Sequence, residues 1–357
     1  MRRKQEQHQE MGEEGGCSPF VIPFFIAQQG CPHQCLFCNQ RAISGAAGPG
    51  PDGATVAATI RNTLARPRDR RRPVQVAFYG GSFTGLARSR QEELLGAVRS
   101  FLEGGEVATI RISTRPDYLN PEIASFLKKQ DVGLVELGIQ SFDQRVLDLC
   151  RRGHQVEQVE EAFAHLRGAG IGVGGQLMVG LPGERTREVL AGARRLAGLG
   201  PELVRIYPAL VLAGSPLADL YREARFRPLT LAGAVALCAK MAAIFIEAAI
   251  PVARIGLQPG PSLEGDLLAG PYHPAFGELV QARLYFKRLR SLLAGLQKER
   301  GATTIRVILA ARDRSLLSGR QGYYYQRLSY LGLLRGVELA YVAGLPRLVI
   351  VPQIDSG

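Results

Sequence analysis

The apolar run Val21-Ile-Pro-Phe-Phe-Ile-Ala27 leads into the motif Cys31-Pro-His-Gln-Cys35-Leu-Phe-Cys38. The run predicts a buried strand, and the C-x₃-C-x₂-C spacing places three thiols on the loop that follows it. Three thiolates can ligate three irons of a 4Fe–4S cluster and leave the fourth iron open, whereas ferredoxins that only transfer electrons usually supply four cysteines. The motif therefore predicts a cluster held by Cys31, Cys35 and Cys38, with an iron that a small molecule can chelate.

The alternatives for this loop are a zinc site or a set of unligated thiols. Zinc requires four ligands. His33 lies inside the same loop, where it would reach the same metal only awkwardly, and no further Cys or His follows at the spacing of zinc ligands. Cys150 and Cys238 lie in helix-like runs and are expected to be small buried apolar residues, while Cys17 stands apart from the motif.

Along the chain on either side of this loop, apolar stretches typical of strands alternate with amphipathic stretches typical of helices. Continuous apolar runs with intervening helices are typical of a parallel sheet buried on both faces. The sequence therefore predicts an α/β protein with either a partial or full TIM-like barrel or a doubly wound sheet. In either fold, chemistry lies at the carboxyl ends of the strands. The expected strands are 21–27, 74–79, 109–113, 134–139, 172–179 and 203–211, and the expected helices between them are 55–64, 91–102, 121–129, 155–166 and 187–196.

The segment after this barrel has a different pattern and a different charge. We expect a lead-in over residues 1–17 without defined structure, the barrel over 18–260, and a small C-terminal α+β extension over 261–357. The whole chain of 357 residues has a formal net charge of +12, and residues 279–357 alone carry 13 basic and 4 acidic side chains, a net +9. This asymmetry indicates that the C-terminal extension faces a polyanion.

Composition also excludes some classes of protein. Hydrophobic residues make up 46% of the chain, which suits a globular protein with a sizeable core. No apolar run is long enough to span a membrane, and the first residues lack the apolar segment of a secretory signal. We therefore expect a cytoplasmic protein with no membrane partner.

These features resemble the radical S-adenosylmethionine (SAM) superfamily, which carries C-x₃-C-x-aromatic-C after the first barrel strand. Phe37 fills the aromatic position. The second strand ends in Gly80-Gly81-Ser82, similar to the Gly-Gly-Glu-type motif with which the family receives the methionine amino group of SAM. The resemblance covers residues 20–256 and implies that the fold is a partial TIM-like (βα)6 barrel. It also implies a 4Fe–4S cluster, SAM as cofactor, and an electron donor that reduces the cluster.

A finer resemblance is to the radical SAM part of the elongator catalytic subunit and its short bacterial relatives. It implies that Gln140 and Arg152 contact the ribose and carboxylate of SAM, and that Gln176 belongs to the same site. In oxygen-independent coproporphyrinogen oxidases an Asp stands at the position of Gln176, so this residue argues against a tetrapyrrole substrate. The resemblance is carried by the segments 113–118, 135–141, 152–154, 178–183 and 204–208.

Four polar residues at the strand ends are candidates for catalysis, each with a structural alternative: Arg115, Asp117, Glu136 and Tyr207. Arg115 could pair locally with Asp117, and Glu136 could be a buried residue paired with Arg111 or Arg115, since structural ion pairs gather in such clefts. Tyr207 could be an apolar wall with a satisfied hydroxyl.

The tail holds a second motif, Ser318-Gly319-Arg320-Gln321-Gly322, followed by Tyr323. We expect a strand at 304–309 before it, a helix at 321–334 after it, and a hairpin of strands 337–342 and 347–351. A G-x-x-G loop between such elements is similar to that of the KH module, which clamps nucleic-acid backbone. Gly319, Arg320, Gly322 and Tyr323 are therefore candidates for RNA contact; the alternative is an ordinary loop with core tyrosines.

Three functions remain open on the sequence. The first is a radical SAM enzyme that modifies RNA, with tRNA the favoured class. The second is a radical SAM enzyme acting on a small molecule or tetrapyrrole, and the third is an iron–sulfur RNA-binding protein without turnover. The chain has no room for the acetyltransferase domain of the elongator subunit, so the chemistry of that domain cannot be carried over.

Overall fold

The computed structural model describes residues 19–26, 29–31, 35–45, 48, 50–299, 305–347 and 349–354. The lead-in predicted for residues 1–17, together with Cys17 and His33, lies outside the described residues. The described chain forms two compact units that are interleaved in sequence: residues up to Ile139, 147–176 and 260–266 make the first, and 140–146, 177–259 and 267–357 make the second. The boundary expected at residue 260 stays a prediction.

The central sheet has seven strands in the order β1-β2-β3-β4-β5-β6-β8. The pairs β1–β2, β2–β3, β3–β4 and β6–β8 are parallel. Parallel neighbours require crossover connections, and a helix intervenes between most successive strands. The expected fold class, an α/β partial TIM-like barrel, is confirmed. The strands are β1 Phe20–Phe25, β2 Val74–Tyr79, β3 Thr109–Thr114, β4 Val132–Gln140, β5 Gly172–Val179, β6 Leu203–Pro208 and β8 Val252–Ile255.

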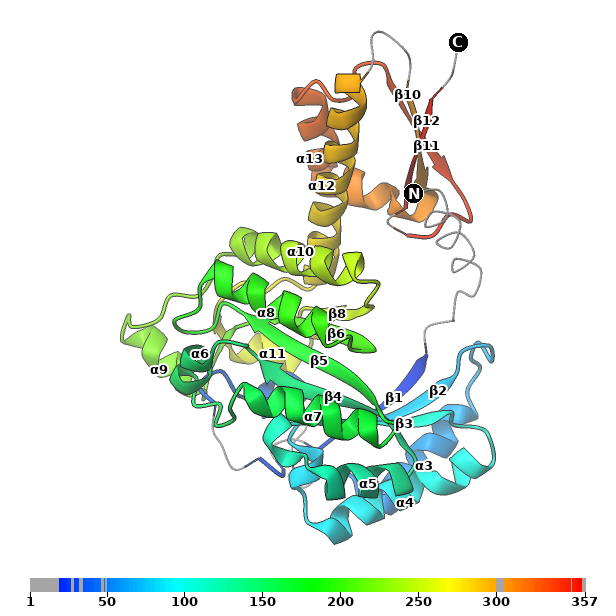
Figure 1. Cartoon of the computed structure of the whole chain (residues 1–357), viewed down its shortest axis with the longest axis vertical. Coiled ribbons are helices and arrows are strands. Elements are labelled where there is room, and N and C mark those ends of the chain that lie inside the picture. Colours follow the sequence, from blue (N-terminus) through cyan, green and yellow to red (C-terminus); the bar gives the residue numbers. More distant parts are fainter. Residues whose placement is uncertain are drawn as a thin grey trace. The chain divides into compact units, whose positions relative to one another are not determined.

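In the first unit, helices α3, α4, α5 and α7 accompany strands β1 to β4 (Figure 1). Their starts follow from local chemistry: Asp52 accepts a hydrogen bond from the Thr55 amide at the start of α3, and Asn120 does the same for Ile123 in α5. The helices and short 3₁₀ turns of this unit are α2 Gln40–Ser44, α3 Gly53–Leu64, η1 Phe83–Gly85, α4 Arg88–Glu103, η2 Pro116–Tyr118, α5 Pro121–Lys129, α7 Glu157–Gly168 and α11 Pro261–Asp266. Helix α6, Gln144–Leu149, is divided between the two units.

The second unit holds the rest of the barrel and the C-terminal extension. Among its helices, α10 is rich in buried alanines and aliphatic residues, including Cys238, which is fully buried as expected. Its elements are α8 Thr186–Gly198, β7 Val211–Leu212, α9 Pro216–Arg222, α10 Leu231–Glu247, β9 Leu267–Ala269, α12 Phe276–Glu299, β10 Ile305–Ala310, η3 Ala311–Asp313, α13 Arg314–Tyr330, β11 Val337–Val342 and β12 Ile350–Ile354.

The C-terminal extension is an α+β unit with its own core. Helices α12 and α13 lie side by side next to the sheet β11-β10-β12 (Figure 1). Tyr285, Leu289, Val307, Leu317 and Leu328 are fully buried between them. The extension therefore folds around a hydrophobic cluster of its own rather than as a loose tail.

Two expectations for this extension are wrong. The strands β11 and β12 do not form a hairpin, because both pair with β10: β11 runs parallel to β10, and β12 runs antiparallel along its other edge. The apolar β10 is the central strand, and its residues Ile305, Val307, Leu309 and Ala310 are buried. The G-x-x-G segment is not a loop either, because α13 begins at Arg314 and runs through it to Tyr330.

Within the described residues, no helix is both long enough and apolar enough to cross a membrane.

Candidate functional site

The cysteine loop and the Gly-Gly-Ser turn after β2 are interlocked through their backbones. The Ser82 amide donates to the Gln29 carbonyl at 3.0 Å, and the Gly81 amide donates to Gln40 Oε1 at 2.8 Å. A Cβ on Gly30 would collide with the Ser82 carbonyl oxygen, and a Cβ on Gly81 would collide with the carbonyl of Gln29. Gly30 also has a φ of +67°, which L side chains rarely adopt. Only glycine permits the two loops to approach this closely.

The three motif cysteines gather on this loop. Cys35 is buried, and Cys31 and Cys38 are half-buried. Burial, together with the neighbouring Cys35 and Cys31, raises the pKa of the Cys38 thiol to about 11. That mutual effect means that the three sulfurs lie within electrostatic range of one another. Phe37, between them in the motif, is half-buried.

This donor set fits a 4Fe–4S cluster. No three Cys, His, Asp or Glu side chains among the described residues converge closely enough to hold a single metal ion. A four-iron cluster makes a different demand, since each thiolate binds a separate iron. Three thiols on one loop, backed by the glycine cradle of Gly30 and Gly81, meet that demand.

Arg152 lies directly against the loop. Its Nη1 lies 3.6 Å from Cys35 Sγ, and its Nη2 donates to the Gly138 carbonyl at 2.6 Å. Its Nε is buried without a hydrogen-bond partner among the described atoms. The sequence resemblance implied that Arg152 contacts SAM; its hydrogen-bond partners here are the Gly138 carbonyl and a cysteine sulfur of the motif.

Arg115 is the second guanidinium near the cysteines, and its side chain is only 1% exposed. Its Nε and Nη2 donate to the two carboxylate oxygens of Asp117 at 2.9 and 2.8 Å, so the expected local pair is present. Burial lowers the pKa of Arg115, but the Asp117 carboxylate and the cysteines Cys31 and Cys35 outweigh that effect and raise it. Nη1, with its two N–H groups, is buried with no hydrogen-bond partner in the described part of the chain.

A chain of hydroxyls ties this arginine to the Gly-Gly-Ser turn. Thr114 Oγ1 lies 2.8 Å from Ser82 Oγ and 2.5 Å from Thr84 Oγ1. The Arg115 amide also donates to Ser82 Oγ at 3.3 Å. The Ser82 side chain therefore couples the end of β2 to the end of β3, a role that its position in the motif did not reveal.

Glu136 has the structural partner that the sequence offered as an alternative. It forms a buried ion pair with Arg111, in which Nε and Oε1 are 2.5 Å apart. Breaking such a pair leaves an uncompensated buried charge, so both residues have a structural role whatever else they do.

The remaining predicted residues lie in the strands β4, β5 and β6. Gln140 is buried at the end of β4 with a φ of +71°, an unusual conformation for a residue other than glycine. Gln176 is half-buried in β5. The Tyr207 hydroxyl accepts a hydrogen bond from Arg205 at 3.0 Å, so the expectation of a satisfied hydroxyl is met.

Sequence reasoning missed Glu184, which follows the Gly180–Gly183 turn. Its carboxyl accepts from the amides of Gly180 at 2.5 Å and Leu181 at 3.2 Å, and burial raises its pKa to about 8. Asp and Glu next to turns often accept hydrogen bonds from the amides of the turn. The position of Glu184 directly after the Gly180–Gly183 turn was therefore the one signal in the sequence for this contact.

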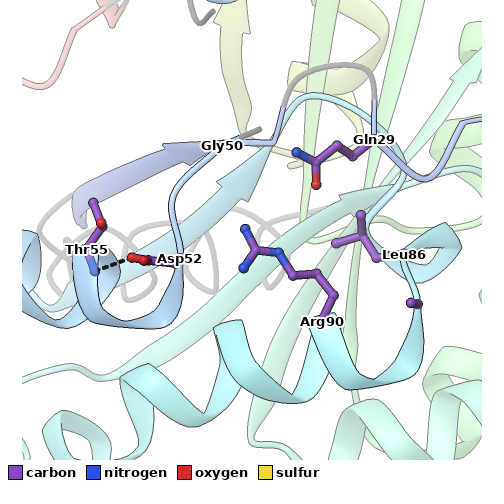
Figure 2. A pocket seen from close by; sticks show the side chains of 7 residues that line it. Gln29, Gly50, Asp52, Thr55, Leu86 and Arg90 are labelled. Carbon is purple, nitrogen blue, oxygen red and sulfur yellow. Dashed lines mark hydrogen bonds between the residues drawn. The ribbon is translucent and has the colours of Figure 1, made fainter. Parts of the chain in front are cut away.

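A hollow of about 660 Å³ opens beside Gln29, one residue before the cysteine cradle, and reaches the starts of α3 and α4 (Figure 2). Its polar side chains are already in use: Asp52 caps α3, and Arg90 donates to the Pro51 carbonyl and to Glu93. Two of the polar side chains that line the hollow, Asp52 and Arg90, are therefore engaged within the protein.

Comparison with known families decides the class of this site. Residues 25–196 match the radical SAM superfamily, and residues 201–286 match the radical SAM C-terminal domain. The chain belongs to the radical SAM superfamily of enzymes. The matched region contains the cysteine loop and the strand ends described above.

The relatives of this radical SAM enzyme are of two kinds. An uncharacterized protein of Methanocaldococcus jannaschii is 29% identical over 225 residues, covering 59% of this chain and 67% of its own length. The tRNA uridine(34) acetyltransferase of Methanocaldococcus infernus is 35% identical over 120 residues, which are 33% of this chain but only 22% of that protein. The likeness to the acetyltransferase thus concerns one part of a much longer protein.

A solved structure shares the fold. The archaeal Elp3 of Methanocaldococcus infernus, lacking its N-terminus, superposes with a TM-score of 0.58 at 23% identity, covering 76% of this chain and 63% of its own. At that identity the likeness bears on the fold and on nothing finer.

Proposed function

We propose that this radical SAM enzyme binds a 4Fe–4S cluster through Cys31, Cys35 and Cys38, cleaves SAM, and modifies RNA, with tRNA the favoured class. The observation that carries the proposal is the interlocked cysteine loop, in which three thiols converge against the Gly-Gly-Ser turn. When bound, the reduced cluster supplies the electron that splits SAM into methionine and a 5′-deoxyadenosyl radical, which abstracts hydrogen from the substrate.

The chain's own residues bind and orient the cofactor. The Gly80–Ser82 turn offers backbone groups to the methionine amino group, as in the family. The unpartnered Nη1 of Arg115 suits the methionine carboxylate, because arginine donates directionally to carboxylates and this one is held in place by Asp117. Phe37, Gln140 and Gln176 are proposed for the remaining contacts with SAM.

Arg152 and burial prepare the cysteine loop for the cluster. Burial favours the neutral thiol of Cys38, so cluster binding must release its proton. The positive charge of Arg152 beside Cys35 Sγ compensates part of the negative charge that three thiolates bring together. The same burial excludes water from the site, which protects a radical from side reactions.

RNA as the substrate is supported by two independent features. One is the relative whose name states that it acts on tRNA uridine 34, and whose matched segment is 35% identical. The other is the net charge of +9 on residues 279–357, which suits a phosphate backbone. The small-molecule alternative has neither in its favour.

The experiment uses the purified full chain, reconstituted with iron and sulfide without oxygen. We expect about four irons per chain, an absorbance shoulder that bleaches on reduction, and release of 5′-deoxyadenosine from SAM by the reduced protein. Cys35→Ala is expected to lose the full cluster, while Cys238→Ala, a buried cysteine outside the motif, keeps it. A complete cluster in Cys35→Ala would contradict the ligand assignment.

The substrate is tested by nucleoside profiling of tRNA from a strain that lacks the gene. We expect one modified nucleoside to disappear and to return when the wild-type gene, but not Cys35→Ala, is restored. An unchanged nucleoside profile, together with active SAM cleavage, would move the proposal to the small-molecule class.

A further inference from the structure

The structure places a stripe of aromatic and basic side chains on α13. Tyr323, Arg327 and Tyr330 are spaced four and then three residues apart, and residues at this spacing lie on one face of a helix. Tyr323 is 58% exposed and Tyr330 is 82% exposed. The Arg327 guanidinium lies 5.6 Å from the centre of the Tyr330 ring.

The inner end of this stripe is anchored to the core of the extension. The Tyr323 ring packs edge-on against Tyr324 at 5.2 Å, and Tyr324 stacks on Phe286 of α12 at 4.9 Å. An exposed ring whose position is fixed by a second ring behind it has lost its conformational freedom before any ligand arrives. It therefore costs less entropy to use as a stacking surface than a mobile side chain does.

The charge of the extension that carries the stripe favours a polyanionic partner. Of the acidic residues in this extension, Asp313 is fully buried and accepts a hydrogen bond from Arg347, and Glu338 pairs with Arg306. Exposed basic side chains of the same unit include Arg288, Arg290, Arg312 and Arg335. Aromatic rings beside arginines in a basic unit are the combination with which proteins stack unpaired bases and hold their phosphates.

We propose that the Tyr323–Arg327–Tyr330 stripe binds unpaired nucleotides of the RNA substrate, with the two rings stacking on bases and Arg327 held over the backbone or a base. This inference rests on the proposed function, because it takes RNA to be the substrate. It replaces the loop expected for the G-x-x-G segment, since Gly319 and Gly322 lie within the span of α13, where Gly322 has a φ of +74°.

The test measures binding of the full chain to a fluorescein-labelled tRNA transcript and to a short single-stranded RNA. Replacing both rings, Tyr323→Ala with Tyr330→Ala, should weaken binding by roughly tenfold or more, given the usual contribution of base stacking on one aromatic ring. The dependence of affinity on salt should hardly change, because tyrosines neutralise no phosphates. Tyr323→Phe with Tyr330→Phe should keep most of the affinity.

Tyr325→Ala is the matched control. It removes an exposed tyrosine (49%) from the same helix, but two residues from Tyr323 and so on another face. Iron content and circular dichroism should equal those of the wild type in all variants, which separates RNA binding from folding and from the cluster.

The outcomes distinguish this proposal from the one on which it rests. If the wild type binds RNA and the double alanine variant binds equally well, or if Tyr325→Ala loses as much, the stripe is wrong and the RNA proposal stands. If the wild type binds no RNA, both are overturned. Binding of an acidic protein but not of RNA would assign the stripe to a protein partner, and would overturn the proposal that the stripe binds nucleotides.

Discussion

The cysteine loop and the α13 helix both combine arginines with a glycine-containing motif, but the arginines are buried at the cysteine loop and exposed on α13. At the cysteine loop, Arg115 and Arg152 are buried and bonded to a carboxylate, a carbonyl and a sulfur, and each glycine is required by a close approach of backbone. On α13, Arg327 and the tyrosines of its face are exposed, and nothing lies within 4 Å of where a Cβ would stand on Gly319 or Gly322. The first arrangement fixes a geometry before any ligand binds, whereas the second presents a surface.

Replacing one glycine by alanine should destabilise the cysteine loop but stabilise α13, and this is the largest difference that we expect between the two regions. Gly30→Ala is expected to prevent stable cluster assembly, because its Cβ would collide with the Ser82 carbonyl oxygen and the φ of +67° is strained. Gly319→Ala should stabilise α13 by up to about 1 kcal/mol, since alanine favours helix and the site has room. Iron content and thermal unfolding measure both.

Gly105→Ala separates strain from collision. Gly105 has almost the same φ, +68°, but no atom within 4 Å of a built Cβ. It should therefore cost only the backbone strain, about 1 to 2 kcal/mol, and keep the cluster. A cluster-loaded Gly30→Ala protein as stable as Gly105→Ala would show that the interlocking of the two loops is not required.

Removing a buried arginine should change the cluster rather than the RNA affinity. Arg152→Met deletes the N–H group that faces Cys35 Sγ, and hydrogen bonds to the sulfurs and local charge set cluster potentials. We expect a lower midpoint potential in an EPR-monitored titration, because the reduced cluster loses a neighbouring positive charge. Arg151→Met, at the exposed neighbouring position, should leave the potential unchanged; equal potentials in all three proteins would contradict the contact.

The smallest expected effect concerns Glu184, whose folded-state pKa is raised by burial from 4.5 to about 8. The folded state therefore holds this proton where the unfolded state has released it, so the stabilisation is full below pH 4.5 and is lost as the pH rises to 8. Glu184→Gln cannot titrate and should flatten the dependence of the unfolding temperature on pH across this window. An identical pH dependence in wild type and variant would mean that Glu184 is ionised in the folded protein.

The fold could be predicted from local patterns wherever those patterns repeat. The strands 74–79 and 172–179 and the helix 121–129 are found at the residues expected, because apolar runs, a Pro at the helix start and an Asn cap are all local signals. The strand expected over 203–211 is divided instead, and β6 ends at Pro208, a residue that cannot donate to a neighbouring strand.

The candidate functional site also combines features that local sequence patterns predict with features that they do not. Spacing alone selected Cys31, Cys35 and Cys38, and order along the chain selected the Gly-Gly-Ser turn, since both are contiguous in sequence. Three other features of the site arise only in the folded protein: the contact of Arg152 with Cys35, the hydrogen bond between Thr114 and Ser82, and the burial of Glu184. No local pattern in the sequence indicates which side chains will meet or be buried in this way.

The α/β class, the three-thiol motif and the basic charge of the C-terminal extension follow from the sequence, because periodicity, spacing and charge are properties of the chain. Three other features depend on the folded protein: β10 lies between β11 and β12, the G-x-x-G segment falls within the span of a helix, and Nη1 of Arg115 has no hydrogen-bond partner among the described residues. Strand pairing, helix extension and side-chain partners cannot be read from local patterns, because distant segments compete for the same buried space.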